Sequence, residues 1–198
     1  MSEEMKEQTA GTKFSMNSLE EELKREKHKN AFWRTIRRTL YALVVVAALA
    51  VLVAVMVLPV LQITGNSMMN TMQNGDICVA FRGSGYEKGD IIAFYYSNDI
   101  LVKRVIAEAG DYVSIDDDGN VTVNGTVLDE PYVFEKELGD CNITFPYQVP
   151  EGKVFVLGDH RSISVDSRNT AIGCVDEEQV LGKVLFRVWP LSEFGGFD

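Results

Sequence analysis

A serine and a lysine stand in sequence surroundings that could support peptide-bond hydrolysis. Ser67 follows Gly65 in a loop-like segment, residues 63–72. Glycine there lets the backbone approach a substrate closely, and amide groups of the turn could form an oxyanion hole. Lys103 lies in an apolar run, residues 100–106. A lysine takes a proton from serine only when neutral, so burial must lower its pKa from about 10.4 to roughly 7–8. The alternative for Lys103 is an edge-strand lysine that discourages aggregation.

His160 is the other candidate base, because it is the only histidine after residue 61. No G-x-S-x-G nucleophile elbow accompanies it, so the sequence gives little support to a Ser-His-Asp triad. Metal chemistry has little support either. Three consecutive aspartates, residues 116–118, lack the spaced ligands of an EF-hand, and the three cysteines lack metal-ligand spacing. We expect neither a metal nor another cofactor.

An uncharged segment, residues 40–61, must position these groups relative to a membrane. Its 22 residues would reach roughly 33 Å as a helix, enough to cross the bilayer core. The run LYALVVVAALAVLVAVMVL is apolar on all sides and longer than the core of a signal peptide. We therefore expect a transmembrane anchor in contact with membrane lipid.

Charge on the two sides of this segment predicts its orientation. Arg34, Arg37 and Arg38 precede it, whereas the first basic residue after it is Arg82. By the positive-inside rule, residues 1–39 form a cytoplasmic tail and residues 62–198 an extracytoplasmic domain of a single-pass protein in the cell membrane. The outer domain carries 10 basic and 22 acidic residues, which argues against a nucleic-acid partner.

The outer domain reads as mostly β. Short Val/Ile/Phe-rich runs such as ICVAF, IIAFYY and KVFVL alternate with turn residues, and no long helical periodicity follows the anchor. Asp118-Gly119 and Asn124-Gly125 are hairpin turn signals, because these residues tolerate positive φ. Residues 129–150 are the least regular part, and we expect a flexible excursion there.

Three segments of the outer domain together resemble the bacterial type I signal peptidases. Residues 65–72, GNSMMNTM, resemble that family's G-x-S-M-x-P-T-L. Residues 103–111, KRVIAEAGD, resemble K-R-V-x-G-x-P-G-D, and residues 158–168, GDHRSISVDSR, are similar to G-D-N-R-x-x-S-x-D-S-R. The segment YEKGDIIAF, residues 86–94, also matches the family between its first two motifs. The matches span nearly the whole outer domain in the family's order.

The resemblance implies a β-rich catalytic domain on one N-terminal transmembrane helix, with a role for each matching residue. Ser67 would be the nucleophile and Lys103 the general base, with Ser164 supplying a hydroxyl that orients the lysine amine. A supporting polar network would consist of Asp159, Arg161, Asp166 and Arg168.

Four positions depart from the family pattern, which puts local loop shape in question: Asn70, Ala107 and Ala109 replace proline, glycine and proline, and His160 replaces asparagine. Gly65 occupies a position where some members carry a serine that assists the oxyanion hole. Oxyanion stabilisation would then rest mainly on backbone N–H groups, notably that of Ser67.

The sequence thus predicts a membrane-anchored serine endopeptidase that removes signal peptides from exported preproteins after small residues. Ser67 lies six residues beyond Leu61, which would hold the site near the bilayer surface. Two alternatives remain. One is a catalytically silent anchored β-domain that binds envelope partners, motivated by the four departures. The other is a self-cleaving Ser/Lys regulator, which would require a DNA-binding or regulatory module.

Overall fold

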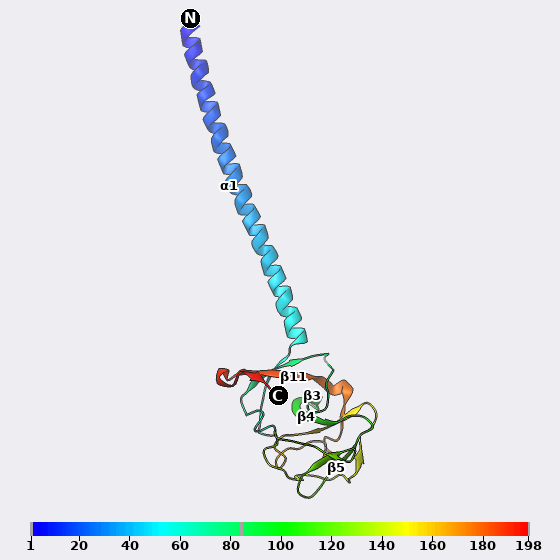
Figure 1. The fold of residues 1–198 in the computed structure, drawn as a ribbon. Helices are drawn as coiled ribbons and strands as arrows, with labels where there is room; N and C mark the ends of the chain where they lie inside the picture. The colour runs from blue at the N-terminus through cyan, green and yellow to red at the C-terminus, as the bar shows by residue number, and fades with distance from the viewer. Residues whose placement is uncertain (1, 84, 198) are drawn as a thin grey trace. The chain divides into compact units, whose positions relative to one another are not determined.

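The computed structural model of the chain divides into two compact units, Met1–Val53 and Ala54–Asp198. It describes residues 2–83 and 85–197, those up to residue 23 by their backbone alone. The first unit is formed by helix α1 (Ser2–Val57), whose last turn belongs to the second unit (Figure 1).

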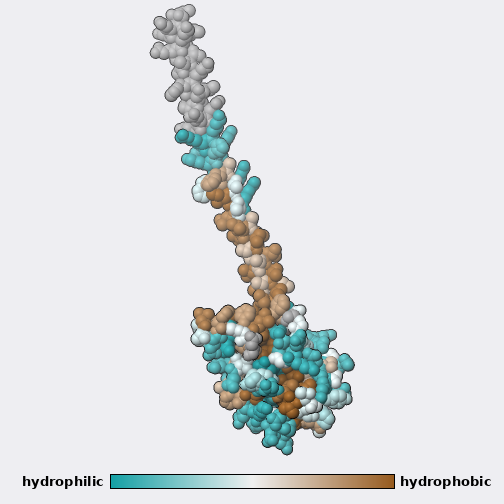
Figure 2. Space-filling view, viewed as in Figure 1, coloured by the Kyte–Doolittle hydropathy of each residue, from teal (hydrophilic) through white to brown (hydrophobic). Residues whose placement is uncertain are grey.

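Helix α1 contains one segment, Lys24–Val57, that is long and apolar enough to cross a membrane by length and composition. Most of its large apolar side chains, including Leu43, Val51 and Val55, are more than half exposed. Figure 2 shows them as an apolar band that follows a hydrophilic stretch of the same helix. A helix that is apolar on every side is suited to lipid.

The helix is shorter at its C-terminal end than the apolar run predicts. It ends at Val57, and Val60–Gln62 form strand β1 instead of continuing the helix to Leu61. Pro59 lies between the two elements, where its missing N–H and fixed φ favour a break. The last residues of the uncharged run therefore belong to the β domain.

The larger sheet has eight strands and carries the residues of the candidate site. Its order is β1-β2-β11-β3-β4-β9-β10, with β12 beside β11, and all its neighbouring strands are antiparallel. The strands are β2 (Ile77–Phe81), β3 (Ile91–Tyr96), β4 (Asp99–Ala107), β9 (Lys153–Leu157), β10 (Val175–Asp176), β11 (Val180–Trp189) and β12 (Gly195–Gly196). Short 3-10 turns, η1 (Glu177–Gln179) and η2 (Leu191–Glu193), precede and follow β11.

The smaller sheet has the order β7-β6-β5-β8 and contains the predicted hairpin turns. Its strands are β5 (Tyr112–Ile115), β6 (Val121–Val123), β7 (Thr126–Val127) and β8 (Tyr147–Gln148). Asn124 and Gly125 join β6 to β7 with φ values of 52° and 81°, the positive φ pair that a tight hairpin requires. The predicted fold class, a mostly β domain with one N-terminal apolar helix, is confirmed.

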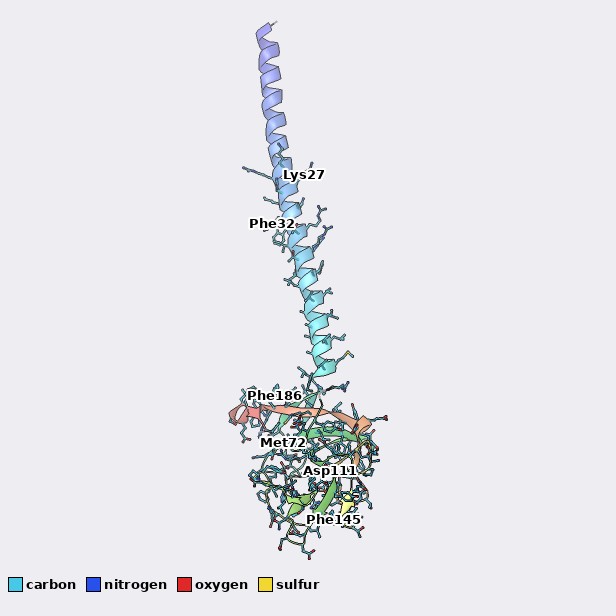
Figure 3. All side chains as sticks on the ribbon, turned by 45° about the vertical axis from the view of Figure 1, so that its right-hand side comes forward. Lys27, Phe32, Met72, Asp111, Phe145 and Phe186 are labelled. Atoms are coloured by element: carbon cyan, nitrogen blue, oxygen red, sulfur yellow. The ribbon has the colours of Figure 1, made fainter. Side chains whose placement is uncertain are left out.

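A hydrophobic cluster beneath the segment after β1 positions the candidate nucleophile. It includes Leu61 of β1, Ile63 directly after that strand, and Met68 and Met72 farther along the segment. Met72 is completely buried (labelled in Figure 3), and its main-chain N–H donates to the carbonyl of Met68. The two methionines therefore fix the backbone on the C-terminal side of Ser67 by packing.

Residues 129–150 are irregular, as the sequence predicts, but they are tied to the segment 158–168. The N–H of Phe134 donates to the carbonyl of Asp159 at 3.0 Å, and Arg168 donates to the carbonyl of Leu138 at 2.6 Å. The excursion is therefore attached to residues 158–168 at these points, and its expected flexibility stays a prediction.

Candidate active site

The loop between β1 and β2 presents Ser67. Its two ends are joined because Ile63 N–H donates to the carbonyl of Asp76 at 2.8 Å. Gly65 adopts a φ of 95°, which favours glycine, and its N–H donates to the side-chain oxygen of Asn74 at 3.0 Å. Ser67 is partly exposed at the turn that follows, while its neighbour Met68 is buried.

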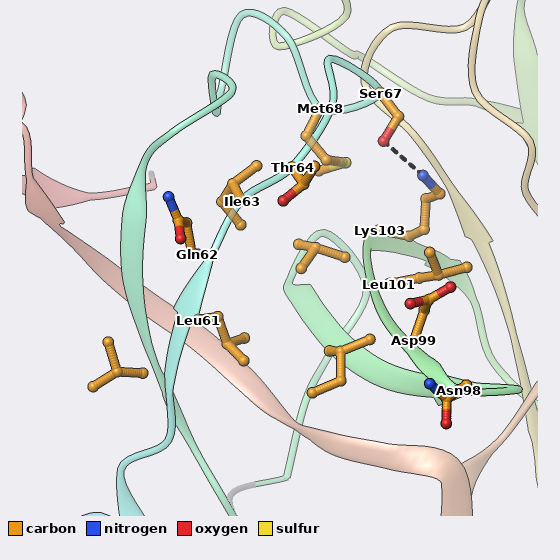
Figure 4. A pocket seen from close by; sticks show the side chains of 13 residues that line it. Leu61, Gln62, Ile63, Thr64, Ser67, Met68, Asn98, Asp99, Leu101 and Lys103 are labelled. Carbon is orange, nitrogen blue, oxygen red and sulfur yellow. Dashed lines mark hydrogen bonds between the residues drawn. The ribbon is translucent and has the colours of Figure 1, made fainter.

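Strand β4 brings Lys103 to this serine. Lys103 pairs with Ile92 of β3, and its side chain is only 4% exposed. Its Nζ lies 2.8 Å from Ser67 Oγ (Figure 4). Burial lowers the pKa of Lys103 from 10.5 to about 8, although the nearby carboxylate of Asp166 acts in the opposite direction. The structure thus places a serine hydroxyl against an amine that is neutral in mildly alkaline solution.

The segment 158–168 packs behind the nucleophile. The main-chain N–H of His160 donates to the carbonyl of Ser67 at 3.0 Å. A Cβ at Gly158 would lie 2.5 Å from that carbonyl oxygen and 2.2 Å from Ser164 Oγ, so only glycine allows this approach. The His160 ring lies 4.6 Å from that of Phe134, and its Nδ1 is buried without a hydrogen-bond partner in the described part of the chain.

Ser164 is buried beside this contact, but its predicted link to the lysine is not formed. Its Oγ has no hydrogen-bond partner among residues 2–83 and 85–197. The hydroxyl is therefore available, while the hydrogen bond that the buried Lys103 amine makes among the described residues is the one to Ser67.

Asp166 and Arg168 form a completely buried ion pair that fixes the same segment. Arg168 Nε donates to Asp166 at 2.8 Å, and Arg168 also donates to the carbonyl groups of Arg161 and Ser164. Asp166 accepts a further hydrogen bond from the N–H of Gly158 at 3.0 Å. Because all these groups are satisfied, the pair can be buried and hold the loop in one shape.

The other two predicted network residues pair with partners that the sequence analysis did not single out. Asp159 accepts two hydrogen bonds from Arg104, at 3.0 and 2.7 Å. Arg161 pairs with Glu130 at 2.5 Å, and both side chains are almost fully buried. Arg104 follows Lys103 in the second motif and could have been suspected, whereas only the need of a buried arginine for a carboxylate points to Glu130.

A cleft of about 430 Å³ leads away from Ser67 and Lys103 (Figure 4). One wall is formed by residues 60–64 and the other by residues 98–103. Strand β4 pairs with β9 only from Arg104 onward, so within the described chain its first half has one free edge, as does β1. Apolar side chains line much of the cleft: Leu61, Ile63, Met68, Ile100 and Val102.

The described residues contain no group of three or more His, Cys, Asp or Glu side chains arranged to hold a metal ion. The chemical groups gathered at the head of the cleft are a hydroxyl, a buried amine and main-chain amides.

Comparisons with known proteins find similarity to one family. The family described as "Signal peptidase, peptidase S26" matches residues 36–189. The chain is 41% identical over 153 residues to Signal peptidase IB of Staphylococcus aureus (strain COL), covering 67% of this chain and 78% of that protein. It is 36% identical over 148 residues to thylakoidal processing peptidase 1, chloroplastic, of Arabidopsis thaliana, covering 66% of this chain and 42% of that protein. The crystal structure of a signal peptidase I from Enterococcus faecalis V583 aligns with a TM-score of 0.41 and 32% identity, covering 50% of this chain and 97% of that one.

Proposed function

This chain belongs to the signal peptidase family, peptidase S26, and we propose that it cleaves signal peptides from preproteins with Ser67 as nucleophile and Lys103 as general base. Membership makes it a membrane-anchored serine endopeptidase whose substrates are preproteins that bear signal peptides. The observation that carries the assignment of the two residues is the 2.8 Å contact between Ser67 Oγ and the buried Lys103 Nζ.

The chemistry follows from this contact. Neutral Lys103 accepts the hydroxyl proton as Ser67 Oγ attacks the scissile carbonyl, and the resulting ammonium then gives that proton to the departing amine. The acyl group is left as an ester on Ser67. Lys103, neutral again, deprotonates a water molecule that attacks the ester and frees the signal peptide with a new carboxyl terminus. The Lys103 ammonium then returns the proton to the departing Ser67 Oγ, which restores the hydroxyl and the neutral amine.

The negative charge on the attacked carbonyl oxygen requires hydrogen-bond donors. The main-chain N–H of Ser67 has no partner within the described residues and is the donor that we assign to the oxyanion. Gly65 brings no hydroxyl to this place, so the backbone carries the oxyanion hole. Ser164 Oγ, free and buried nearby, would receive a hydrogen bond from the Lys103 amine once the proton moves.

The cleft fits the signal-peptide side of the cut. An extended peptide with small side chains can add as a strand along the free edge of β4, facing β1 across the cleft. Val102 packs against the cluster that contains Leu61 and Ile63, and Ile100 shares its face of β4 because side chains alternate along a strand. Both would receive alternate substrate side chains. The first and third residues before the cut must then be small and apolar, as in A-x-A.

The topology completes the proposal. Arg34, Arg37 and Arg38 lie at the N-terminal end of the apolar part of α1, and the next basic residue is Arg82. This asymmetry favours a cytoplasmic tail, residues 1–39, and an extracytoplasmic catalytic domain in the cell membrane. Protease added outside sealed cells should then digest epitopes in the domain and spare an epitope on the tail.

Cleavage of a purified preprotein by the full chain in detergent micelles tests the function. Sequencing the product's N-terminus should place the cut after an A-x-A segment, and Ser67→Ala should yield no product. A folded wild-type chain that cleaves none of several preproteins would instead support the silent binding domain.

A further inference from the structure

One end of the cleft carries an exposed carboxylate. Asn98 and Asp99 line this end, at the turn between β3 and β4 (Figure 4). Asp99 is exposed, and its carboxylate has neither an ion pair nor a hydrogen bond to any described residue. The cleft therefore changes from an apolar middle to an acidic end.

Alternation along β4 places Asp99 on a defined face. Val102 packs against the cluster that contains Leu61 and Ile63, whereas Leu101 packs against the cluster on the opposite face of the strand. Because side chains alternate along a strand, Ile100 shares the face of Val102, and Asp99 shares the face of Leu101. Figure 4 shows Asp99, Leu101 and Lys103 following one another along the same side of β4.

A substrate strand in this cleft has a fixed direction if Ser67 attacks it. Strand β4 runs from Asp99 to Lys103, toward the dyad, so the signal peptide, which runs toward the cut, lies parallel to it. In a parallel pair, neighbouring residues direct their side chains to the same face. If the first residue before the cut lies beside Val102, next to Lys103, the second and third lie beside Leu101 and Ile100 and the fourth lies beside Asp99.

We propose that Asp99 selects the fourth residue before the cleavage site, favouring lysine, arginine or another hydrogen-bond donor and disfavouring aspartate or glutamate. This inference rests on the function proposed above. It adds a residue that determines substrate specificity beyond the positions where small side chains are required, the first and third before the cut. The site is exposed, so the selection is moderate and screened by salt.

A matched set of preproteins tests the inference with the full-length protein in detergent. Three substrates differ only in Lys, Gln or Glu at the fourth position before the cut. We expect wild-type kcat/KM to favour Lys over Glu by about three- to tenfold at low salt, with Gln between them. The preference should shrink in about 0.5 M salt, because the Debye length falls below roughly 5 Å.

Two variants separate a local contact from the domain's overall negative charge. Asp99→Asn should bring the kcat/KM values of the three substrates to within about twofold of one another, and Asp99→Lys should invert their order. Asp117→Asn removes the same charge from an exposed turn outside the cleft and should leave the preference unchanged.

The inference is overturned if the ratio of kcat/KM for the Lys substrate to kcat/KM for the Glu substrate is the same in wild type and Asp99→Asn. It is also overturned if Asp117→Asn lowers this ratio as much as Asp99→Asn does. Failure of the proposed function would give a different result, because wild type would then not cleave the Gln substrate, or Ser67→Ala would cleave it.

Discussion

The main-chain N–H of His160 donates a 3.0 Å hydrogen bond to the carbonyl oxygen of Ser67. The third sequence motif is therefore attached to the backbone of the candidate nucleophile itself. The imidazole ring has another environment, beside Phe134, and makes no hydrogen bond to Ser67. His160 thus contacts Ser67 through its backbone, and asparagine, the family's residue at this position, could make the same main-chain hydrogen bond.

The rate of cleavage should depend on pH through Lys103. Its pKa of about 8 leaves the amine protonated at lower pH, so kcat/KM should fall about tenfold for each pH unit below 8. Initial rates between pH 6 and 10, on a substrate without titrating groups near the cut, measure this decrease in kcat/KM. His160→Ala should show the same decrease with a midpoint near pH 8. A decrease with a midpoint near pH 6.5 that disappears in His160→Ala would assign the base to histidine.

Lys103 should reduce the stability of the folded protein at neutral pH. A pKa that falls from 10.5 to about 8 on folding corresponds to about 3 kcal/mol of destabilisation below pH 8, where lysine is protonated in both states. Between pH 8 and 10.5 the folded protein binds fewer protons than the unfolded chain, so wild-type stability should rise with pH. Lys103→Met should therefore be more stable than wild type at pH 7, and the difference should shrink toward pH 10.5. Denaturant unfolding in micelles that shows a less stable variant at pH 7 would refute this.

Gly158 should be essential for the position of the nucleophile. An alanine Cβ there would lie 2.5 Å from the Ser67 carbonyl oxygen and 2.2 Å from Ser164 Oγ, so the backbone must move. We expect Gly158→Ala to lose at least about tenfold in kcat and 1–3 kcal/mol in stability. Gly195→Ala is the control, because a Cβ there meets no atom within 4 Å beyond its chain neighbours. Wild-type turnover by Gly158→Ala would contradict the packing described here.

Glu130 should stabilise the protein by pairing with Arg161. Removing the carboxylate leaves a buried guanidinium without a countercharge, which typically costs about 3–5 kcal/mol. Glu130→Ala should lower the unfolding midpoint strongly in denaturant titrations. Lys153→Ala breaks a more exposed pair with Asp176 and should change stability by less than about 1 kcal/mol. Equal changes in the free energy of unfolding for the two substitutions would show that the buried Glu130–Arg161 pair stabilises the fold no more than an exposed pair does.

Local pattern was sufficient to predict several features of the fold. The apolar run around Lys103 indicated a strand, and Asn124-Gly125 indicated a hairpin, because both features depend on neighbouring residues. The run left two alternatives for Lys103, a buried base with a lowered pKa and an edge-strand lysine, and the structure shows the side chain buried. The end of α1 was less accessible from the sequence. An apolar run is compatible with either a helix or a strand. Residues Val60–Gln62 form a strand because they pair with β2, a contact that the local sequence does not reveal.

The local sequence pattern could not predict which residues pair across long distances in the chain. Glu130 lies in an irregular segment, and its contact with Arg161 arises only when that segment folds over residues 158–168. Arg104 was part of a recognised motif, but nothing in its neighbours indicated a pair with Asp159. The assignments of Ser67, Lys103 and Ser164 as functional residues stay predictions, now with a geometry that can be tested.

Single-turnover cleavage of a preprotein by wild type, Lys103→Arg and Lys103→Met tests the central claim most directly, with the fold of each variant checked by circular dichroism. Arginine keeps its proton and methionine has none to exchange, so both variants should be reduced by at least about 10³-fold from pH 7 to 10, while wild type cleaves at the signal-peptide junction. Turnover by folded Lys103→Arg within tenfold of wild type would contradict a Ser67–Lys103 dyad.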